Sequence, residues 1–394
     1  MLPKTGDTLN PNNWRPIAIL DVTYKIFAKV LHGRVAPTLE AQQPSEQMGF
    51  RRQRGTDDAL LVLECVVGAS VEWNSPIWFL SIDLTKAFDK IAYAALFQAL
   101  EDQGVEEKYL VLLRALYSGQ HGQVGAEAVF DICRGVRQGD VLSPCLFNAA
   151  LEAVIRRWKS QLGDRGLQLD PARERLTNVR FADDLLLFGS SMAEVVEMFE
   201  LLSLKLEEAG LSINPSKTKM FTTGALATSS VAPMMVDAAG SMVELVRGAA
   251  THKYLGRMFS GDLTKRGQCN LSHRLSCGWF KFHCFQHSLL NRKIPVHLRL
   301  RLFESVVSPT VLYSLSSTPL TATQQQKLDA TQRKMLRRIV GWVHHSDEDW
   351  HSIGARMKAR LDAALVRSPV RTWSEARNRQ RERFLKSMET DQAP

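Results

Sequence analysis

The stretch FADDLLLF, residues 181–188, decides how this sequence is expected to fold. Its apolar residues, together with Val179, predict a pair of β-strands over residues 179–188 that is interrupted by Asp183 and Asp184. Adjacent carboxylates beside buried strands are costly to desolvate, and they repel each other unless a cation lies between them. Because the stretch offers hard oxygen ligands without His or Cys, it favours a Mg²⁺ or Mn²⁺ site.

A third carboxylate follows the same pattern earlier in the chain. The apolar run from Ile77 to Ile82 predicts a buried strand that ends at Asp83. Two metal ions about 3.5–4 Å apart, held by such acids, serve in-line nucleotidyl transfer, in which one activates a 3′-hydroxyl and the other steadies the pyrophosphate. The acids therefore indicate polymerase chemistry. FADD taken alone also fits a solvated turn, and a nuclease can use a similar acidic cluster.

The remaining periodicity predicts a mixed α+β chain in which helices and strands alternate irregularly. Apolar residues between Ile26 and Val35 recur at helical spacing, and Gly104 and Gly119 each follow a predicted helix where a left-handed cap belongs. The weakly patterned residues 222–243 predict a loop or hairpin, with a domain boundary near residue 225. Further helices are predicted over residues 56–71, 91–103, 106–118, 143–161, 191–209, 285–340 and the last fifty residues.

Composition and charge describe a chain that folds and has a basic end. Of its 394 residues 45% are hydrophobic, which excludes collagen-like and wholly disordered polymers. The formal net charge is +9, and residues 330–394 hold 14 Lys and Arg against 8 Asp and Glu. Clustered positive charge suits a polyanion such as a nucleic acid. The alternative is a solvated helix with these surface residues: Arg377, Arg379, Arg381 and Arg383.

Other features predict a soluble intracellular protein, in the nucleus or the cytoplasm, with no membrane partner. The first residues lack the apolar segment of a signal peptide, and the six cysteines contain no C-x-x-C pair and fit reduced thiols. The longest uncharged stretch, residues 305–326, is too polar to span a bilayer.

A Cys and His series invites a zinc interpretation, but its spacing differs from that of usual zinc sites. Its members are Cys269, His273, Cys277, Cys284 and His287. The first three share one helical face and predict packing, so no zinc is expected. His344 and His345 are interpreted as surface residues.

Seven motifs surround the acids in a fixed order. They are NWRPIAIL (13–20), QMGFRRQRGT (47–56), FLSIDLTKAFD (79–89), GVRQGDVLSP (135–144), FADDLLLF (181–188), GLSINPSKTK (210–219) and KYLG (253–256). This series resembles the reverse transcriptase domain of non-LTR (LINE-type) retrotransposons, and group II intron-type reverse transcriptases share its outline. The resemblance implies an α+β right-hand polymerase with an antiparallel palm sheet. The expected parts are a fingers-like region (1–78), a palm with interspersed fingers elements (79–260), a thumb-like helical region (261–345) and a basic helical tail (346–394).

The resemblance also implies roles for individual residues. Asp83, Asp183 and Asp184 would hold the metal, and Lys217 would protonate the departing pyrophosphate, unless it is a solvated loop lysine. Phe88 would lie against the sugar of the incoming nucleotide and exclude a 2′-hydroxyl.

The segment Arg137, Gln138 and Gly139 would lie beneath the nascent base pair, although Gly135 and Gly139 also fit ordinary turns. Asp89 is expected to be structural. The guanidinium groups of the fingers would grip triphosphate or template, since they match phosphate in a bidentate manner. The candidates are Arg15, Arg51, Arg52 and Arg54.

We therefore expect an RNA-directed DNA polymerase that extends a 3′-hydroxyl primer on an RNA template with dNTPs and Mg²⁺, or Mn²⁺. The chain starts shortly before NWRP and shows no endonuclease or Cys/His knuckle, which suggests a truncated copy. The alternatives are a catalytically inactive RNA-binding relic and a group II intron-type reverse transcriptase or maturase. The oligomeric state stays open.

Overall fold

The structure is a computed structural model of residues 1–394 that divides into two compact units. It describes all residues except 1, 4–6, 8, 10–13, 16, 125–127, 229–233, 239, 342–347, 367, 369 and 391–394, and only the backbone of 2, 3, 15, 124, 128 and 387–390. The first unit comprises residues Met1–Val62 and Val66–Arg247, and the second Leu63–Cys65 and Gly248–Pro394. The division at 247 and 248 lies later than the boundary predicted near 225, because a strand hairpin extends the first unit's sheet.

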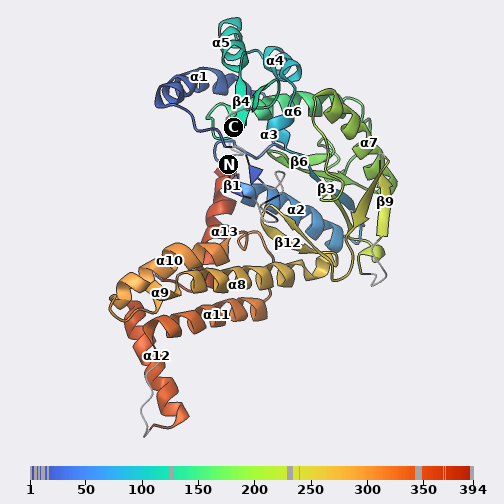
Figure 1. The fold of residues 1–394 in the computed structure, drawn as a ribbon. Coiled ribbons are helices and arrows are strands. Elements are labelled where there is room, and N and C mark those ends of the chain that lie inside the picture. The colour runs from blue at the N-terminus through green and yellow to red at the C-terminus, as the bar shows by residue number, and fades with distance from the viewer. Residues whose placement is uncertain are drawn as a thin grey trace. The chain divides into compact units, whose positions relative to one another are not determined.

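The first unit is built on a six-stranded sheet with the strand order β6-β7-β3-β8-β10-β9 (Figure 1). Its strands are β3 (Trp78–Asp83), β6 (Asn178–Phe181), β7 (Asp184–Gly189), β8 (Lys219–Thr222), β9 (Met234–Ala238) and β10 (Ser241–Leu245). The predicted buried strand, the strand pair at the FADD stretch and the hairpin within 222–243 are confirmed.

The sheet is not wholly antiparallel, as the resemblance had implied. β10 pairs with β8 in parallel, whereas the other neighbouring strands pair antiparallel. The chain leaves β8, forms β9 at the sheet edge and returns as β10 between them. Because β10 reverses β9, it runs in the direction of β8.

Side chains alternate along β3, and apolar ones lie on both faces of the sheet, as a strand in the middle of a sheet requires. Leu80 and Ile82 pack into a core that includes residues of the helices, whereas Phe79 faces the other way and stacks on Phe221 with ring centroids 4.9 Å apart. The helices of this unit are α1 (Val22–Ala41), α2 (Thr56–Glu72), α3 (Ala87–Lys90), α4 (Tyr93–Asp102), α5 (Glu107–Tyr117), α6 (Ser143–Lys159) and α7 (Met192–Glu208). Two small strand pairs complete it: β1 (Leu2–Pro3) with β2 (Trp14–Arg15), and β4 (His121–Val124) with β5 (Ala128–Asp131).

Helix α1 forms where the spacing predicted it, but its buried face differs from the predicted one. Leu31 and Val35 are buried, as expected. Ile26 and Val30, however, are 63% and 60% exposed. The small side chain of Ala28 and the later Leu39 take the buried positions instead, which apolarity alone does not reveal.

The second unit is a short hairpin followed by helices. Its elements are β11 (Thr251–Tyr254), β12 (Arg257–Ser260), α8 (Arg266–Cys284), α9 (Gln286–Leu289), α10 (Val296–Leu312), α11 (Ala322–Val340), α12 (Trp350–Val366) and α13 (Trp373–Thr390). Helices α8, α10 and α11 pack side by side around a common core (Figure 1). Among the described residues, no helix has both the length and the apolar character needed to cross a membrane.

The basic tail is anchored by two buried residues. Trp373 is fully buried, stacks on Phe303 at 5.9 Å and donates a hydrogen bond from Nε1 to Ser308 Oγ at 2.9 Å. Arg377 is buried too, and its guanidinium donates to the carbonyls of Leu315 and Thr318 at 2.8 and 2.6 Å. The sequence interpretation of Arg377 as a surface residue is therefore wrong, because open carbonyls after α10 take its donors. Its neighbours Arg379, Arg381 and Arg383 are exposed.

We predict that Trp373→Ala lowers the free energy of unfolding by about 3–5 kcal/mol, since it removes a large buried side chain and the partner of Ser308. Urea unfolding of the full chain measures this loss. Arg381→Ala, on the exposed side of α13, is the matched control and should stay within about 0.5 kcal/mol of the unchanged protein. Equal stability of the two variants would show that the tail does not belong to the core.

Candidate active site

The pairing of β3 with β7 brings the predicted carboxylates together. Asp83 lies directly opposite Asp184 in the register, and Asp183 occupies the two-residue turn between β6 and β7. The first residue of that turn, Ala182, has a φ of +58°. A non-glycine residue in this region costs roughly 1–2 kcal/mol, so other contacts must hold the turn.

The QMGF segment supplies that support. The buried Gln47 accepts the Ala182 N–H at 3.1 Å and the Gly49 N–H at 2.9 Å through its Oε1. A Cβ on Gly49 would lie 2.2 Å from the Ala182 nitrogen, so only glycine fits there. Only the arginines of this motif were predicted from sequence to have a role, and the role of Gln47 and Gly49 was not predicted.

The acids differ in their surroundings. Burial, followed by the neighbouring charges of Asp183 and Asp83, raises the pKa of Asp184 to about 7. Lys217 acts in the opposite direction and lies with its Nζ 3.6 Å from Asp83 Oδ2, at a partly exposed position. Lys217 therefore lies beside the acids.

The GLSINPSKTK segment is fixed to the end of β3 by its backbone. Asn214 N–H donates to the Asp83 carbonyl at 2.8 Å, and Thr85 N–H donates to the Ser212 carbonyl at 2.8 Å. Thr218 Oγ1 in turn accepts from the Asp83 N–H at 3.4 Å. These contacts hold Lys217 at the end of β3, beside the carboxylate of Asp83.

A cleft of about 860 Å³ opens beside the acids. Five of the seven motifs contribute to its lining, with Phe50, Asp83, Phe88, Gln138, Asp183 and Lys217 among its residues. Within the described residues, no three His, Cys, Asp or Glu side chains enclose an ion by themselves. Mg²⁺ is commonly held by one or two carboxylates together with substrate phosphates, so the acids and the open cleft fit such an ion.

Phe88 belongs to both the cleft and the core. It lines the cleft, stacks on the buried Phe147 at 4.4 Å with an interplanar angle of 18°, and meets Phe50 edge-on at 6.1 Å. The ring of Phe88 therefore lines the cleft and packs against the core at the same time. Phe50, which is 57% exposed, is a cleft residue that no sequence motif argument had selected.

The GVRQGD segment approaches the cleft through its glycines. Gly135 has a φ of +87°, and a Cβ there would lie 2.6 Å from the Asp89 carbonyl oxygen. Gly139 has a φ of +104°. Both glycines have left-handed backbone conformations that fit turns, and Gly135 also allows a close approach to the Asp89 backbone. Gln138 lines the cleft, and its Nε2 donates to Asp89 Oδ1 at 2.8 Å.

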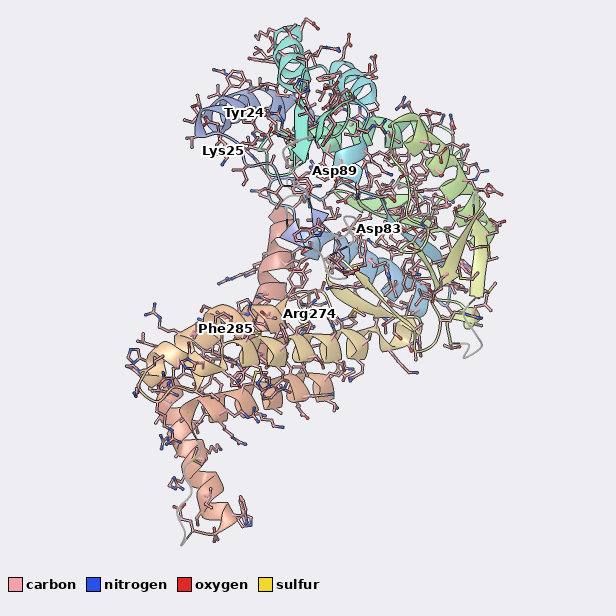
Figure 2. The ribbon with its side chains drawn as sticks, viewed as in Figure 1. Tyr24, Lys25, Asp83, Asp89, Arg274 and Phe285 are labelled. Carbon is pink, nitrogen blue, oxygen red and sulfur yellow. The ribbon has the colours of Figure 1, made fainter. Side chains whose placement is uncertain are left out.

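The guanidinium of Arg137 makes contacts within the protein. It lies over the ring of Tyr24 at 5.0 Å and donates to the Leu116 carbonyl at 2.8 Å. Tyr24 in turn donates to Asp140 at 2.5 Å, and burial together with this bond raises the pKa of Tyr24 to about 12. Figure 2 labels Tyr24 on α1. No motif pointed to this residue, which ties α1 to the GVRQGD segment.

The fingers arginines whose side chains the structure describes are not gathered at the cleft. Arg51 donates to Glu40 at 2.8 Å and to the Pro44 carbonyl at 2.6 Å, and Arg52 lines a separate cavity of about 240 Å³. The described lining of the large cleft includes none of Arg51, Arg52 and Arg54. The side chain of Arg15 lies outside the described residues.

Four members of the Cys and His series lie on α8, and His287 lies on α9. Cys277 Sγ and His273 Nε2 are 3.6 Å apart within one helical face. The part of the chain that the structure describes contains no group of three or more such ligands at this place. His344 and His345 lie outside the described residues.

Residues 2–259, which carry this cleft, match the protein family described as reverse transcriptase (RNA-dependent DNA polymerase). The chain belongs to the reverse transcriptase family. The match covers more than half of the chain and confirms the resemblance seen in the seven motifs.

Several relatives of this reverse transcriptase chain come from mobile elements. A Pol polyprotein of the type-1 retrotransposable element R2 from Popillia japonica is 28% identical over 86% of this chain and 47% of its own length. The R2DM polyprotein of Drosophila melanogaster is 26% identical over 68% of this chain and 25% of its own length, and the polymerase of its mobile element jockey 23% identical over 86% and 37%. This chain thus spans half or less of these relatives.

Solved telomerases show a more distant likeness to this reverse transcriptase chain. An apo telomerase from Candida tropicalis has a TM-score of 0.47 and 12% identity, and the match covers 89% of this chain and 52% of that one. A Candida albicans telomerase with an RNA fragment has a TM-score of 0.39 and 13% identity over 87% and 53%. The family assignment rests on the sequence match and not on these scores.

We predict that metal-free protein loses stability as the pH rises from about 4 to about 7, the window between the ordinary and the folded pKa of Asp184. The reason is that the Asp184 carboxyl loses its proton near pH 4 in the unfolded chain, whereas the folded chain keeps this proton until the pH approaches 7. Mg²⁺ binds the ionised form, so it should raise the melting temperature more at pH 8 than at pH 6.

Thermal unfolding with and without Mg²⁺ at both pH values checks this prediction. Asp184→Asn is the control: its Mg²⁺-induced shift should be small and should not vary with pH. A wild-type shift of the same size at pH 6 and pH 8 would contradict the proposed coupling between the proton and the metal.

Proposed function

We propose that this chain is an RNA-directed DNA polymerase of the non-LTR retrotransposon type, which extends the 3′-hydroxyl of a primer on an RNA template with dNTPs. The observation that carries the proposal is the register of β3 and β7, which sets Asp83, a residue of the large cleft, opposite Asp184. The names of the R2 and jockey relatives support the element type. The proposal includes an intracellular location, in the nucleus or the cytoplasm, where nucleic acid and dNTPs occur.

We assign the divalent ions to Asp83, Asp183 and Asp184, with Mg²⁺ as the natural ion and Mn²⁺ as a substitute. When bound, Mg²⁺ supplies Lewis acidity that activates the 3′-hydroxyl and steadies the pyrophosphate. The buried position of Asp184 supports the assignment, because its ionised form needs a cation.

The other cleft residues bind and orient the nucleotide in this proposal. Lys217, whose Nζ lies 3.6 Å from Asp83 Oδ2, gives a proton to the departing pyrophosphate. Phe88 bounds the sugar, and Gln138 with Gly139 lies beneath the new base pair. Arg137 lies there with them, since it lines the cleft and its guanidinium is held by Tyr24 and a backbone carbonyl.

The finer architecture is part of the same proposal. We assign residues 1–78 to fingers, 79–260 to palm, 261–345 to thumb and 346–394 to the basic tail. The mixed helices and sheets of a polymerase-type fold support this assignment. Exposed Arg379, Arg381 and Arg383 remain the tail residues suited to a phosphate backbone.

We predict that Asp183→Asn abolishes Mg²⁺-dependent primer extension on an RNA template and leaves template binding nearly unchanged, because it removes one metal ligand and no basic group. Purified full-length chain, a labelled primer and dNTPs provide the assay.

Asp164→Asn is the matched control for this experiment, since Asp164 is exposed and lies away from the cleft lining. It should extend primers like the unchanged protein. Extension by Asp183→Asn at the control rate would contradict the metal assignment. RNA binding without extension by the unchanged protein would favour the inactive relic.

Phe88→Val should raise the use of ribonucleotides relative to deoxynucleotides roughly ten- to a hundredfold. The steric overlap of a 2′-hydroxyl with a packed ring costs on the order of 1–3 kcal/mol, and each 1.4 kcal/mol is about tenfold. The ratio of kcat/KM for rNTP and dNTP measures the change.

The control is Phe147→Leu, which disturbs the ring that Phe88 stacks on but does not belong to the described lining of the cleft. It should lower stability and leave the nucleotide ratio unchanged. If both variants slow the two substrates alike, Phe88 acts only as a core ring.

A further inference from the structure

Gln138 is held at both ends by contacts that the motif itself does not contain. Its side-chain Nε2 donates to Asp89 Oδ1 at 2.8 Å, and its backbone carbonyl accepts the Ala18 N–H at 2.8 Å. Both Gln138 and Asp89 line the large cleft. The sequence predicts only a structural role for Asp89. Its carboxylate nevertheless contacts the Gln138 amide in the lining of the large cleft.

The backbone builds this contact. On either side of Asp89, the carbonyls of Phe88 and Ile91 accept the N–H groups of Val136 and Gly135 at 2.6 and 2.8 Å. Gly135 can come this close only because it lacks a Cβ, which would lie 2.6 Å from the Asp89 carbonyl oxygen. Backbone hydrogen bonds therefore join residues 88–91 to residues 135–136, close to the hydrogen bond between the Asp89 and Gln138 side chains. These two side chains are held facing each other by the backbone on both sides.

The chemistry of the pair fixes which end of the amide faces Asp89. A glutamine amide carries a donor and an acceptor of nearly equal size, so its two orientations differ little in shape. An ionised carboxylate only accepts hydrogen bonds. It therefore holds the Nε2 end of Gln138 and turns the Oε1 end away from itself.

We propose that Asp89 is a positioning residue that fixes the side-chain amide of Gln138, so that its oxygen is presented to the incoming nucleotide as a hydrogen-bond acceptor. This inference rests on the proposed polymerase function. Asp89 lies outside the group of acids assigned to the metal, and its effect on the reaction passes through Gln138. Figure 2 labels Asp89 and Asp83 as separate side chains of the first unit.

A double-mutant cycle tests the proposal. Asp89→Leu keeps a similar shape but accepts no hydrogen bond, and it should lower kcat/KM for dNTP about ten- to thirtyfold, mainly through KM. In a Gln138→Leu background, the same Asp89→Leu change should cost less than about twofold, because no amide is left to orient. An equal loss in both backgrounds would overturn the proposal, since Asp89 would then act independently of Gln138.

A second pair of variants covers the case in which Asp89→Leu does not fold. Gln138→Glu sets two carboxylates against each other and should lower kcat/KM at pH 8 by at least thirtyfold. Adding Asp89→Asn places an amide donor opposite the new carboxylate of residue 138, which still offers an acceptor oxygen to the nucleotide. The double variant should therefore have a kcat/KM at least tenfold higher than that of Gln138→Glu alone. No recovery in the double variant would overturn the proposal, because a purely structural acid gains nothing from this exchange.

The controls separate this proposal from the proposed function. Melting temperatures of all variants identify losses caused by unfolding, and Asp164→Asn again serves as the exposed aspartate control. Unchanged protein that extends no primer contradicts the polymerase function. Unchanged protein that extends primers, combined with variants that show no coupling, contradicts only the role of Asp89.

Discussion

The candidate site depends on one constraint, the register between β3 and β7. Side chains alternate along both strands, so Leu80 and Ile82 enter the helix-covered core opposite Leu187 and Leu185. Asp83 and Asp184 then fall on one face, opposite each other. Because both faces of these strands are buried, a slip of one residue would exchange the side chains packed on the two faces and set Asp83 opposite a residue other than Asp184. Packing of the core therefore sets the carboxylate geometry, and the acids themselves, which repel, contribute nothing to it.

The clustered carboxylates and the strained turn beside them are energetically unfavourable, and this explains the contacts that surround them. Asp184 is partly buried beside two other carboxylates, and Ala182 adopts a left-handed backbone conformation in the adjoining turn. Gln47 and Gly49 hold that turn, while the segment around Asn214 brings Lys217 to the opposite strand. These supports come from positions more than a hundred residues before the turn and about thirty after it. Hydrogen bonds and a close glycine contact hold this turn, because the like charges of the acids oppose its assembly.

Local patterns predicted much of this fold, and long-range partners explain what they missed. The strand that ends at Asp83, the FADD hairpin and most helices follow from periodicity and caps within short segments. The parallel pairing of β8 with β10 depends on where a later hairpin returns. Arg377 looked like a surface arginine because its sequence does not show which carbonyls remain open near residue 315. The three site aspartates were predictable from sequence, whereas the supports from Gln47 and Tyr24 were not.

The glycine-rich segment at 135–140 links two features that sequence motifs treat as separate. Its backbone binds the carbonyl of Phe88, whose ring lines the cleft, and its Gln138 side chain binds Asp89, the next residue. The ring and the amide therefore share one backbone support. A displacement of Gly135 would move both, since a Cβ there meets the Asp89 backbone directly. Under the proposed polymerase function, sugar selection by Phe88 and amide orientation by Asp89 are therefore mechanically coupled, and a change in either is to be interpreted together with the other.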